Sequence, residues 1–140
     1  MVRALAVVVA SCASNGTAMP QVPPASEQTS RVLDTGIFPG VVGGEAAHAL
    51  VAAGITVVDV RTPAEFDRGH VPGAVNIPYD EMYRRYGELG PPSTPVLIYC
   101  KTGRRAGLAT TTLREKGFTQ IYDLQSYDNW VLADAAPAAR

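Results

Sequence analysis

The chain carries one six-residue stretch whose residue types suit nucleophilic chemistry: Cys100, Lys101, Thr102, Gly103, Arg104 and Arg105. A continuously apolar run precedes it at 96–99, and a helical pattern begins at its end. Thiolate rather than thiol is the nucleophile, and helix N-termini and neighbouring cations favour the thiolate. Gly103 permits backbone torsions that let successive N–H groups surround an anion. The stretch therefore predicts a reactive Cys100; the alternative is an inert cysteine buried at a strand end.

The rest of the pattern alternates strands with helices. Apolar runs predict strands at 41–42, 55–60, 74–76, 96–99 and 119–124, with helices at 44–53, 62–69, 80–86, 104–116 and 127–133 and a loop at 87–95. This alternation predicts an α/β fold with a parallel sheet of about five strands flanked by helices. Ligand sites in such sheets lie beyond the carboxyl ends of the strands. Asp59 and Cys100 both stand at such ends, so we expect them on one rim.

Composition limits the function classes. The 140 residues are 46% hydrophobic and 18% charged, with a formal net charge of -1. One domain with a tail fits this length, and nothing in the charge balance suggests a nucleic-acid partner. The two cysteines lie too far apart in sequence to indicate a disulfide framework. No apolar run reaches the ~20 residues of a membrane-spanning helix.

The termini differ in composition from the predicted domain at 40–134. Residues 1–12 combine a basic start with an apolar run, as export signals do. Their end, Val9-Ala10-Ser11-Cys12, resembles a bacterial lipobox, which implies cleavage before Cys12, lipidation of its thiol, and a periplasmic or membrane-anchored protein. The alternative is the frayed start of a cytoplasmic protein. Residues 13–39, rich in Ser, Thr, Pro and Gln, predict a flexible linker, and 135–140 a tail.

Three blocks of this sequence resemble one family. The spacing Cys100-x-x-Gly103-x-Arg105 at a strand-to-helix junction is similar to the active-site loop of rhodanese (thiosulfate sulfurtransferase) domains. The stretches 58–66 and 69–78 are similar to the upstream signature of that family, and 127–130 resembles its aromatic segment. Small exported single-domain rhodaneses of the phage-shock-protein type are similar in size and layout.

The resemblance implies a mechanism without metal or cofactor. Cys100 takes the sulfane sulfur of a donor such as thiosulfate and passes it, as a persulfide, to cyanide or a thiol. Backbone amides from Lys101 to Arg105 would hold the persulfide. The side chains of Arg105, Lys101 and Arg104 would orient the donor.

Other residues of these blocks are expected to support the site. We predict that Asp59 pairs with Arg61 or a loop group, and that both are structural. His70 belongs to a turn in the family, so we expect no Cys–His dyad. Glu65 is predicted to cap a helix through the box Thr62-Pro63-Ala64-Glu65. Trp130 is predicted to lie in the core.

Two positions depart from the family pattern. Gln125-Ser126 stand where many relatives have a glycine pair, so their side chains are expected to narrow the pocket mouth. Ala106 stands where a hydroxyl residue is common, so a hydrogen bond toward the loop is expected to be missing.

Two other functions remain open. A cysteine phosphatase or arsenate reductase usually has five residues between Cys and Arg, and this chain has four between Cys100 and Arg105. A non-catalytic or slow sulfur-carrier module is the second alternative. The expected partners are a small-molecule donor and acceptor, and the protein is expected to be a monomer.

Overall fold

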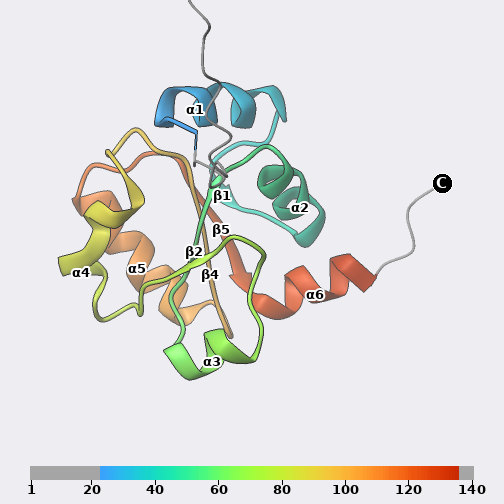
Figure 1. The fold of residues 1–140 in the computed structure, drawn as a ribbon, viewed down its shortest axis with the longest axis vertical. Coiled ribbons are helices and arrows are strands. Elements are labelled where there is room, and N and C mark those ends of the chain that lie inside the picture. Colours follow the sequence, from blue (N-terminus) through green and yellow to red (C-terminus); the bar gives the residue numbers. More distant parts are fainter. Residues whose placement is uncertain (1–22, 136–140) are drawn as a thin grey trace, which may run out of the picture.

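A computed structural model describes residues 23–135 (Figure 1). The predicted signal segment with Cys12 and most of the predicted tail lie outside these residues. The elements, in chain order, are α1 (Ala25–Asp34), β1 (Gly40–Val41), α2 (Gly44–Ala52), β2 (Thr56–Asp59), α3 (Pro63–Arg68), β3 (Val75–Asn76), α4 (Met82–Arg85), the short 3-10 helix η1 (Tyr86–Leu89), β4 (Val96–Cys100), α5 (Arg104–Glu115), β5 (Ile121–Ser126) and α6 (Tyr127–Ala135).

The five strands form one parallel sheet in the order β1-β5-β4-β2-β3. The α/β fold predicted from the alternating pattern is confirmed. The central strand, β4, and its neighbour β2 carry apolar, β-branched-rich runs, and β4 is buried along its whole length. Such continuous runs are typical of strands covered on both faces.

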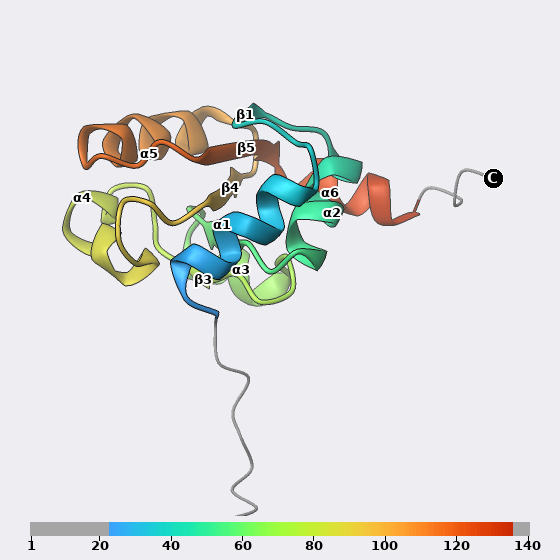
Figure 2. The same ribbon diagram turned by 90° about the horizontal axis from the view of Figure 1, so that it is seen from above.

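Helices cover the two faces of the sheet in separate layers. In Figure 1, α4 and α5 lie to the left of the strands and α2 and α6 to their right; Figure 2 shows the same division from above. Successive side chains of β4 point alternately into the two helix layers. Ile98 packs in the cluster with Met82 of α4 and Leu113 of α5, whereas Leu97 packs in the cluster with Leu50 of α2.

One prediction about the chain before the sheet was wrong. Residues 25–34, taken as part of a flexible linker, form helix α1. Val32 is fully buried in the cluster of α2 and α6, and Gln28 is 2% exposed. Gln28 Nε2 donates to the carbonyl of Pro23, and its Oε1 accepts from the Thr56 hydroxyl at 3.0 Å. The prediction from composition was wrong here because only two side chains of the helix, Gln28 and Val32, are buried against the domain.

The other differences are small. The predicted loop at 87–95 begins with η1, and the strand predicted at 119–124 is displaced to Ile121–Ser126. That displacement places Gln125 and Ser126 inside β5, beside the end of β4. This position matters for the site, because β5 then pairs with β4 up to Cys100.

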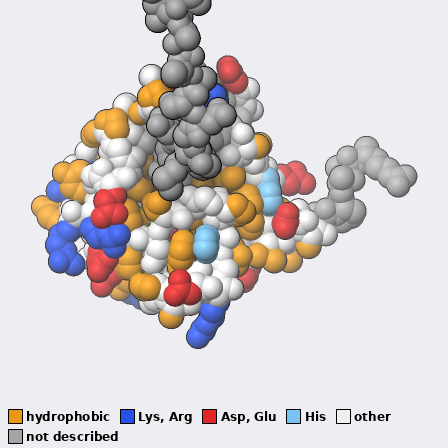
Figure 3. All heavy atoms as spheres, viewed as in Figure 1, with side chains coloured by type: hydrophobic (Ala, Val, Ile, Leu, Met, Phe, Trp, Pro, Cys, Tyr) orange, Lys and Arg blue, Asp and Glu red, His pale blue; other side chains and the backbone are white. Residues whose placement is uncertain are grey.

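Surface charge on the described residues is mixed. Figure 3 shows basic side chains gathered at the left, where acidic ones lie among them. Among the acidic and basic residues that pair, Arg85 of α4 forms ion pairs with Glu81 and Glu88. None of the helices between residues 23 and 135 is long and apolar enough to cross a membrane, and the same residues hold no cluster of potential metal ligands.

The packing of α1 predicts a position-dependent loss of stability. Val32→Ala should lower the free energy of unfolding by about 2 kcal/mol, because it leaves a cavity against α2. Leu33→Ala removes more atoms from the same helix, but Leu33 is 63% exposed, so its cost should stay below about 0.5 kcal/mol. Urea unfolding of both variants measures the difference. Equal effects would contradict the packing of α1.

Candidate active site

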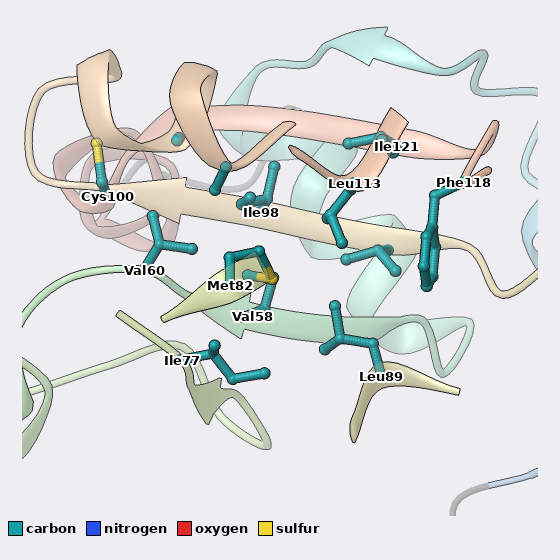
Figure 4. Packing of buried hydrophobic residues seen from close by; sticks show 13 residues of the cluster. Val58, Val60, Ile77, Met82, Leu89, Ile98, Cys100, Leu113, Phe118 and Ile121 are labelled. Atoms are coloured by element: carbon teal, nitrogen blue, oxygen red, sulfur yellow. The ribbon is translucent and has the colours of Figure 1, made fainter. Parts of the chain in front are cut away.

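Cys100 is the last residue of β4 and lies fully buried at the carboxyl rim of the sheet. Figure 4 shows its sulfur directed toward the segment that joins β4 to α5. The backbone N–H of Gly103 donates to Sγ at 3.0 Å. Gly103 is also the N-cap of α5, so the thiol lies at the positive end of a 12-residue helix. This arrangement stabilises negative charge on the sulfur.

Gly103 adopts the left-handed conformation, with φ 97° and ψ -23°. A Cβ built there would lie 3.3 Å from the Cβ of Gln125 on β5. Gly103 therefore meets two requirements, the turn that brings its N–H to the sulfur and close contact with β5. Any other residue would strain the turn and press on Gln125.

Gln125 itself is the one non-glycine residue with positive φ, 70°, between residues 23 and 135. It lies opposite Tyr99, at an irregularity in the register between β4 and β5, and Ser126 lies opposite Cys100. The glycine pair of the resembled family would adopt this conformation without strain. The exposed Gln125 side chain therefore stands next to the cysteine loop, but neither it nor Ser126 lines the pocket described below.

Arg105 does not point its charge at an open site. Its two terminal nitrogens donate to Glu65, with Nη1–Oε2 at 2.8 Å and Nη2–Oε1 at 3.0 Å. Both side chains are 23% exposed. The hydrogen bonds from Arg105 lower the pKa of Glu65 to about 2, outweighing partial burial, which acts in the opposite direction. The pair fastens the start of α5 to α3.

Glu65 has a second role that the sequence did predict. It completes a capping box with Thr62, whose hydroxyl accepts from the Glu65 N–H while the Glu65 carboxylate accepts from the Thr62 N–H. The pairing with Arg105 was not predicted. The two residues are 40 positions apart, and no local pattern connects them.

The predicted pairing of Asp59 with Arg61 is present. Asp59 is fully buried, and Arg61 Nη2 donates to its Oδ2 at 2.7 Å. Arg61 also donates to the carbonyl of Gly69 at 2.6 Å, and its guanidinium lies over the Tyr127 ring at 4.7 Å. Asn76 Nδ2 donates to the carbonyls of both Asp59 and Arg61. This network joins β2, α3 and α6 around the rim and leaves Arg61 a structural residue.

A small pocket of about 180 Å³ adjoins the cysteine loop. One wall is the end of α3 and the glycine after it, a second is Lys101, and a third is the start of α6. The residues that line it are Arg61, Glu65, Arg68, Gly69, Lys101, Tyr127 and Asp128. Gly69 keeps this space open, because a Cβ there would lie 3.2 Å from the Tyr127 hydroxyl.

The remaining predicted residues fall into two groups: those on the cysteine loop, and those that support it from neighbouring elements. Lys101, Thr102 and Arg104 are exposed on the loop around Cys100. His70 stacks on Phe66 with ring centroids 3.7 Å apart, and its Nδ1 lies 2.9 Å from the Phe66 carbonyl. That local role agrees with the predicted turn.

Two apolar positions complete the surroundings of the site. Trp130 is 8% exposed and stacks on His48, so its predicted place in the core is confirmed. Ala106 is fully buried in the same cluster as Cys100. Alanine has no hydroxyl, so this side chain cannot donate a hydrogen bond to the loop.

Fold and site together define an α/β domain with a cysteine at the end of its central parallel strand, next to the N-terminus of a helix. The chain belongs to the rhodanese-like domain family: the sequence model described as "Rhodanese-like domain" matches residues 44–133. Helix α1 precedes the matched region.

Relatives and solved structures agree with this assignment. The chain is 33% identical over 108 residues to "Thiosulfate sulfurtransferase 16, chloroplastic" of Arabidopsis thaliana, covering 66% of this chain and 87% of that protein. It is 38% identical over 65 residues to "Thiosulfate sulfurtransferase PspE" of Escherichia coli, covering 46% of this chain and 62% of that protein. The solved "rhodanese with anions from E. coli" is 33% identical with a TM-score of 0.51, over 53% of this chain and 88% of that one.

The Glu65–Arg105 pair predicts a pH-dependent contribution to stability. The pKa of Glu65 falls from 4.5 to about 2 on folding, so its contribution is complete above pH 4.5 and is lost as the pH falls toward 2. Glu65→Gln should cost about 1 kcal/mol at pH 7, and the gap to the natural protein should shrink toward pH 3. Urea unfolding at several pH values measures both.

The matched control for that experiment is Glu27→Gln, which breaks the exposed pair with Arg31 on α1. Its cost should be close to zero at every pH. A gap between the natural protein and Glu65→Gln that stays constant from pH 7 to pH 3 would contradict the ionic role of Glu65.

The backbone of Gln125 predicts a stabilising substitution. Gln125→Gly should raise the free energy of unfolding by about 1 kcal/mol, because glycine adopts positive φ without a steric cost. Gln120→Gly, at a position without positive φ, should lower it instead. Thermal unfolding compares the two, and a loss of stability in Gln125→Gly would show that side-chain contacts outweigh the backbone strain.

Proposed function

We propose that this protein is a sulfurtransferase of the thiosulfate type, in which Cys100 carries the sulfur as a persulfide. The observation that supports this proposal most directly is the hydrogen bond from the Gly103 N–H, at the start of α5, to the Cys100 sulfur at 3.0 Å. The site is suited to a nucleophilic sulfur, because its amide and helix dipole favour negative charge there. The names of the two relatives described above support the same chemistry.

The proposed reaction has two halves. The Cys100 thiolate attacks the outer sulfur of thiosulfate, a new S–S bond forms, and sulfite leaves with the electron pair of the broken bond. A cyanide or thiolate acceptor then takes the outer sulfur and returns the Cys100 thiolate. Because Cys100 is fully buried, each half requires a displacement of the groups that cover it. Covalent capture of this kind separates donor and acceptor steps.

The loop length favours sulfur over phosphate. Four residues separate Cys100 from Arg105, and the Arg105 guanidinium is bound to Glu65. A phosphatase needs an arginine that reaches the transferred group, and this one is held elsewhere. A slow carrier that loads sulfur without repeated turnover remains the second candidate, since the same loop would hold a persulfide.

Intact-protein mass spectrometry tests the proposal. Thiosulfate treatment of the natural protein should add the mass of one sulfur atom, and later addition of cyanide should remove it and release thiocyanate. Cys100→Ser should gain nothing, whereas Cys12→Ser should behave as the natural protein. Failure of the natural protein to gain sulfur, or an unchanged gain in Cys100→Ser, contradicts the proposal; loading without repeated turnover favours the carrier.

We also propose that the protein is exported and anchored by a lipid on Cys12, as the lipobox-like residues 9–12 suggest. The described chain enters the fold beside Thr56, which pairs in register with Val96 at the start of β4. Cys100 stands at the other end of that strand. A tether before α1 would therefore leave the active rim facing away from the attachment.

Metabolic labelling checks the anchor. Expression in a bacterium supplied with labelled palmitate should label the natural protein, and Cys12→Ala should lose the label. Cys100→Ala should keep it, which excludes acylation of the other cysteine. An unlabelled protein with its first twelve residues intact would contradict export.

A further inference from the structure

The pocket beside the cysteine loop has three charged residues that no other described residue engages. Arg68 and Lys101 have no carboxylate within ion-pair distance among residues 23–135, and Asp128 has no cation. All three side chains are exposed and line the same space of about 180 Å³. The pocket therefore presents two cations and one carboxylate to a ligand.

The other charges of the pocket are already committed. Arg61 is held by Asp59 and by the carbonyl of Gly69. Glu65 accepts from both terminal nitrogens of Arg105. These two ion pairs cancel within the protein, so neither arginine offers net charge to a bound molecule. The family-derived prediction that Arg105 orients the donor is therefore not supported by its contacts.

Arg68 occupies its position because α3 ends there. It is the last residue of that helix, and Gly69 follows with φ 153°, a conformation that glycine adopts readily. The carbonyl of Gly69 is fixed by Arg61, which fastens the end of α3 to the rim. Lys101, the residue after Cys100, lines the same pocket from the opposite element.

We propose that Arg68, with Lys101, determines the preference of this site for a small doubly charged sulfur donor, and that Asp128 weakens that preference. The inference rests on the sulfurtransferase function proposed above and names the residues that recognise the non-transferred end of the donor. The pocket volume equals that of about six water molecules at about 30 Å³ each, which suits a thiosulfate-sized anion. Arg68 is a specificity residue and takes no part in bond making.

Two donors of the same shape test this assignment. Thiosulfate is a dianion, and methanethiosulfonate is a monoanion in which a methyl group replaces one oxygen. In both, Cys100 takes the outer sulfur; the first releases sulfite and the second methanesulfinate. Arg68→Ala should raise KM for thiosulfate about three- to tenfold and for methanethiosulfonate distinctly less, with kcat unchanged for both. Asp128→Asn should lower KM for thiosulfate.

Arg84→Ala is the matched control, since Arg84 is an exposed arginine on α4 that does not line this pocket. Its KM for both donors should equal that of the natural protein. If Arg68→Ala changes KM no more than Arg84→Ala, or changes it equally for both donors, the assignment of Arg68 is overturned. Mass spectrometry of persulfide formation by the natural protein tests the proposed function separately. If the natural protein gains sulfur but Arg68→Ala does not change KM as expected, only the assignment of Arg68 fails.

Discussion

The hydrogen bond from the Gly103 amide to the Cys100 sulfur is the interaction on which the site depends. It exists because β4 places the cysteine at the rim of the sheet and Gly103, the N-cap of α5, follows three residues later. The left-handed turn at Gly103 is what allows so short a connection. Neighbouring β5 closes the other side of the turn, where a Cβ on residue 103 would lie 3.3 Å from the Cβ of Gln125. The chemistry of the thiol therefore follows from the backbone of three adjacent elements.

Ion pairs around the rim hold this geometry. Arg105 binds Glu65 and so joins α5 to α3, while Arg61 binds Asp59 and joins β2 to the end of α3. Both arginines stand in the sequence blocks that carry the family resemblance, and both neutralise a carboxylate of the protein. The charge available to a ligand then belongs to residues outside those ion pairs. This separation of structural from exposed cations explains why counting positive residues near a cysteine overstates the charge that a ligand meets.

Much of this arrangement follows from local sequence. The continuous apolar runs of β2 and β4, the capping box at Thr62 and the shared rim of Asp59 and Cys100 all depend on neighbouring residues or on the general geometry of parallel sheets. Arg61 was one of the two partners predicted for Asp59, because the two residues are only two positions apart in the chain. The parallel sheet was predicted from the alternation of strand-like and helix-like patterns along the sequence.

What the sequence missed depends on contacts between distant segments. The partner of Arg105 lies 40 residues away, and α1 is held by a partly buried Gln28–Thr56 hydrogen bond and one valine. The first leaves no local signal; in the second, one polar and one apolar residue at helical spacing hold the helix, so the polar composition of the stretch concealed it. The extent of β5 was misplaced for a similar reason, because pairing with the end of β4 extends the strand through Gln125 despite its positive φ.

The central claim is that the backbone at the start of α5 binds the sulfur of Cys100 directly. Amide NMR of the ¹⁵N-labelled protein before and after addition of thiosulfate tests it, with mass spectrometry confirming that Cys100 carries the extra sulfur. We predict that the Gly103 amide resonance moves far more than those of exposed loops, and that Cys100→Ser shows no such change. A fully loaded protein whose Gly103 resonance stays in place would contradict the account.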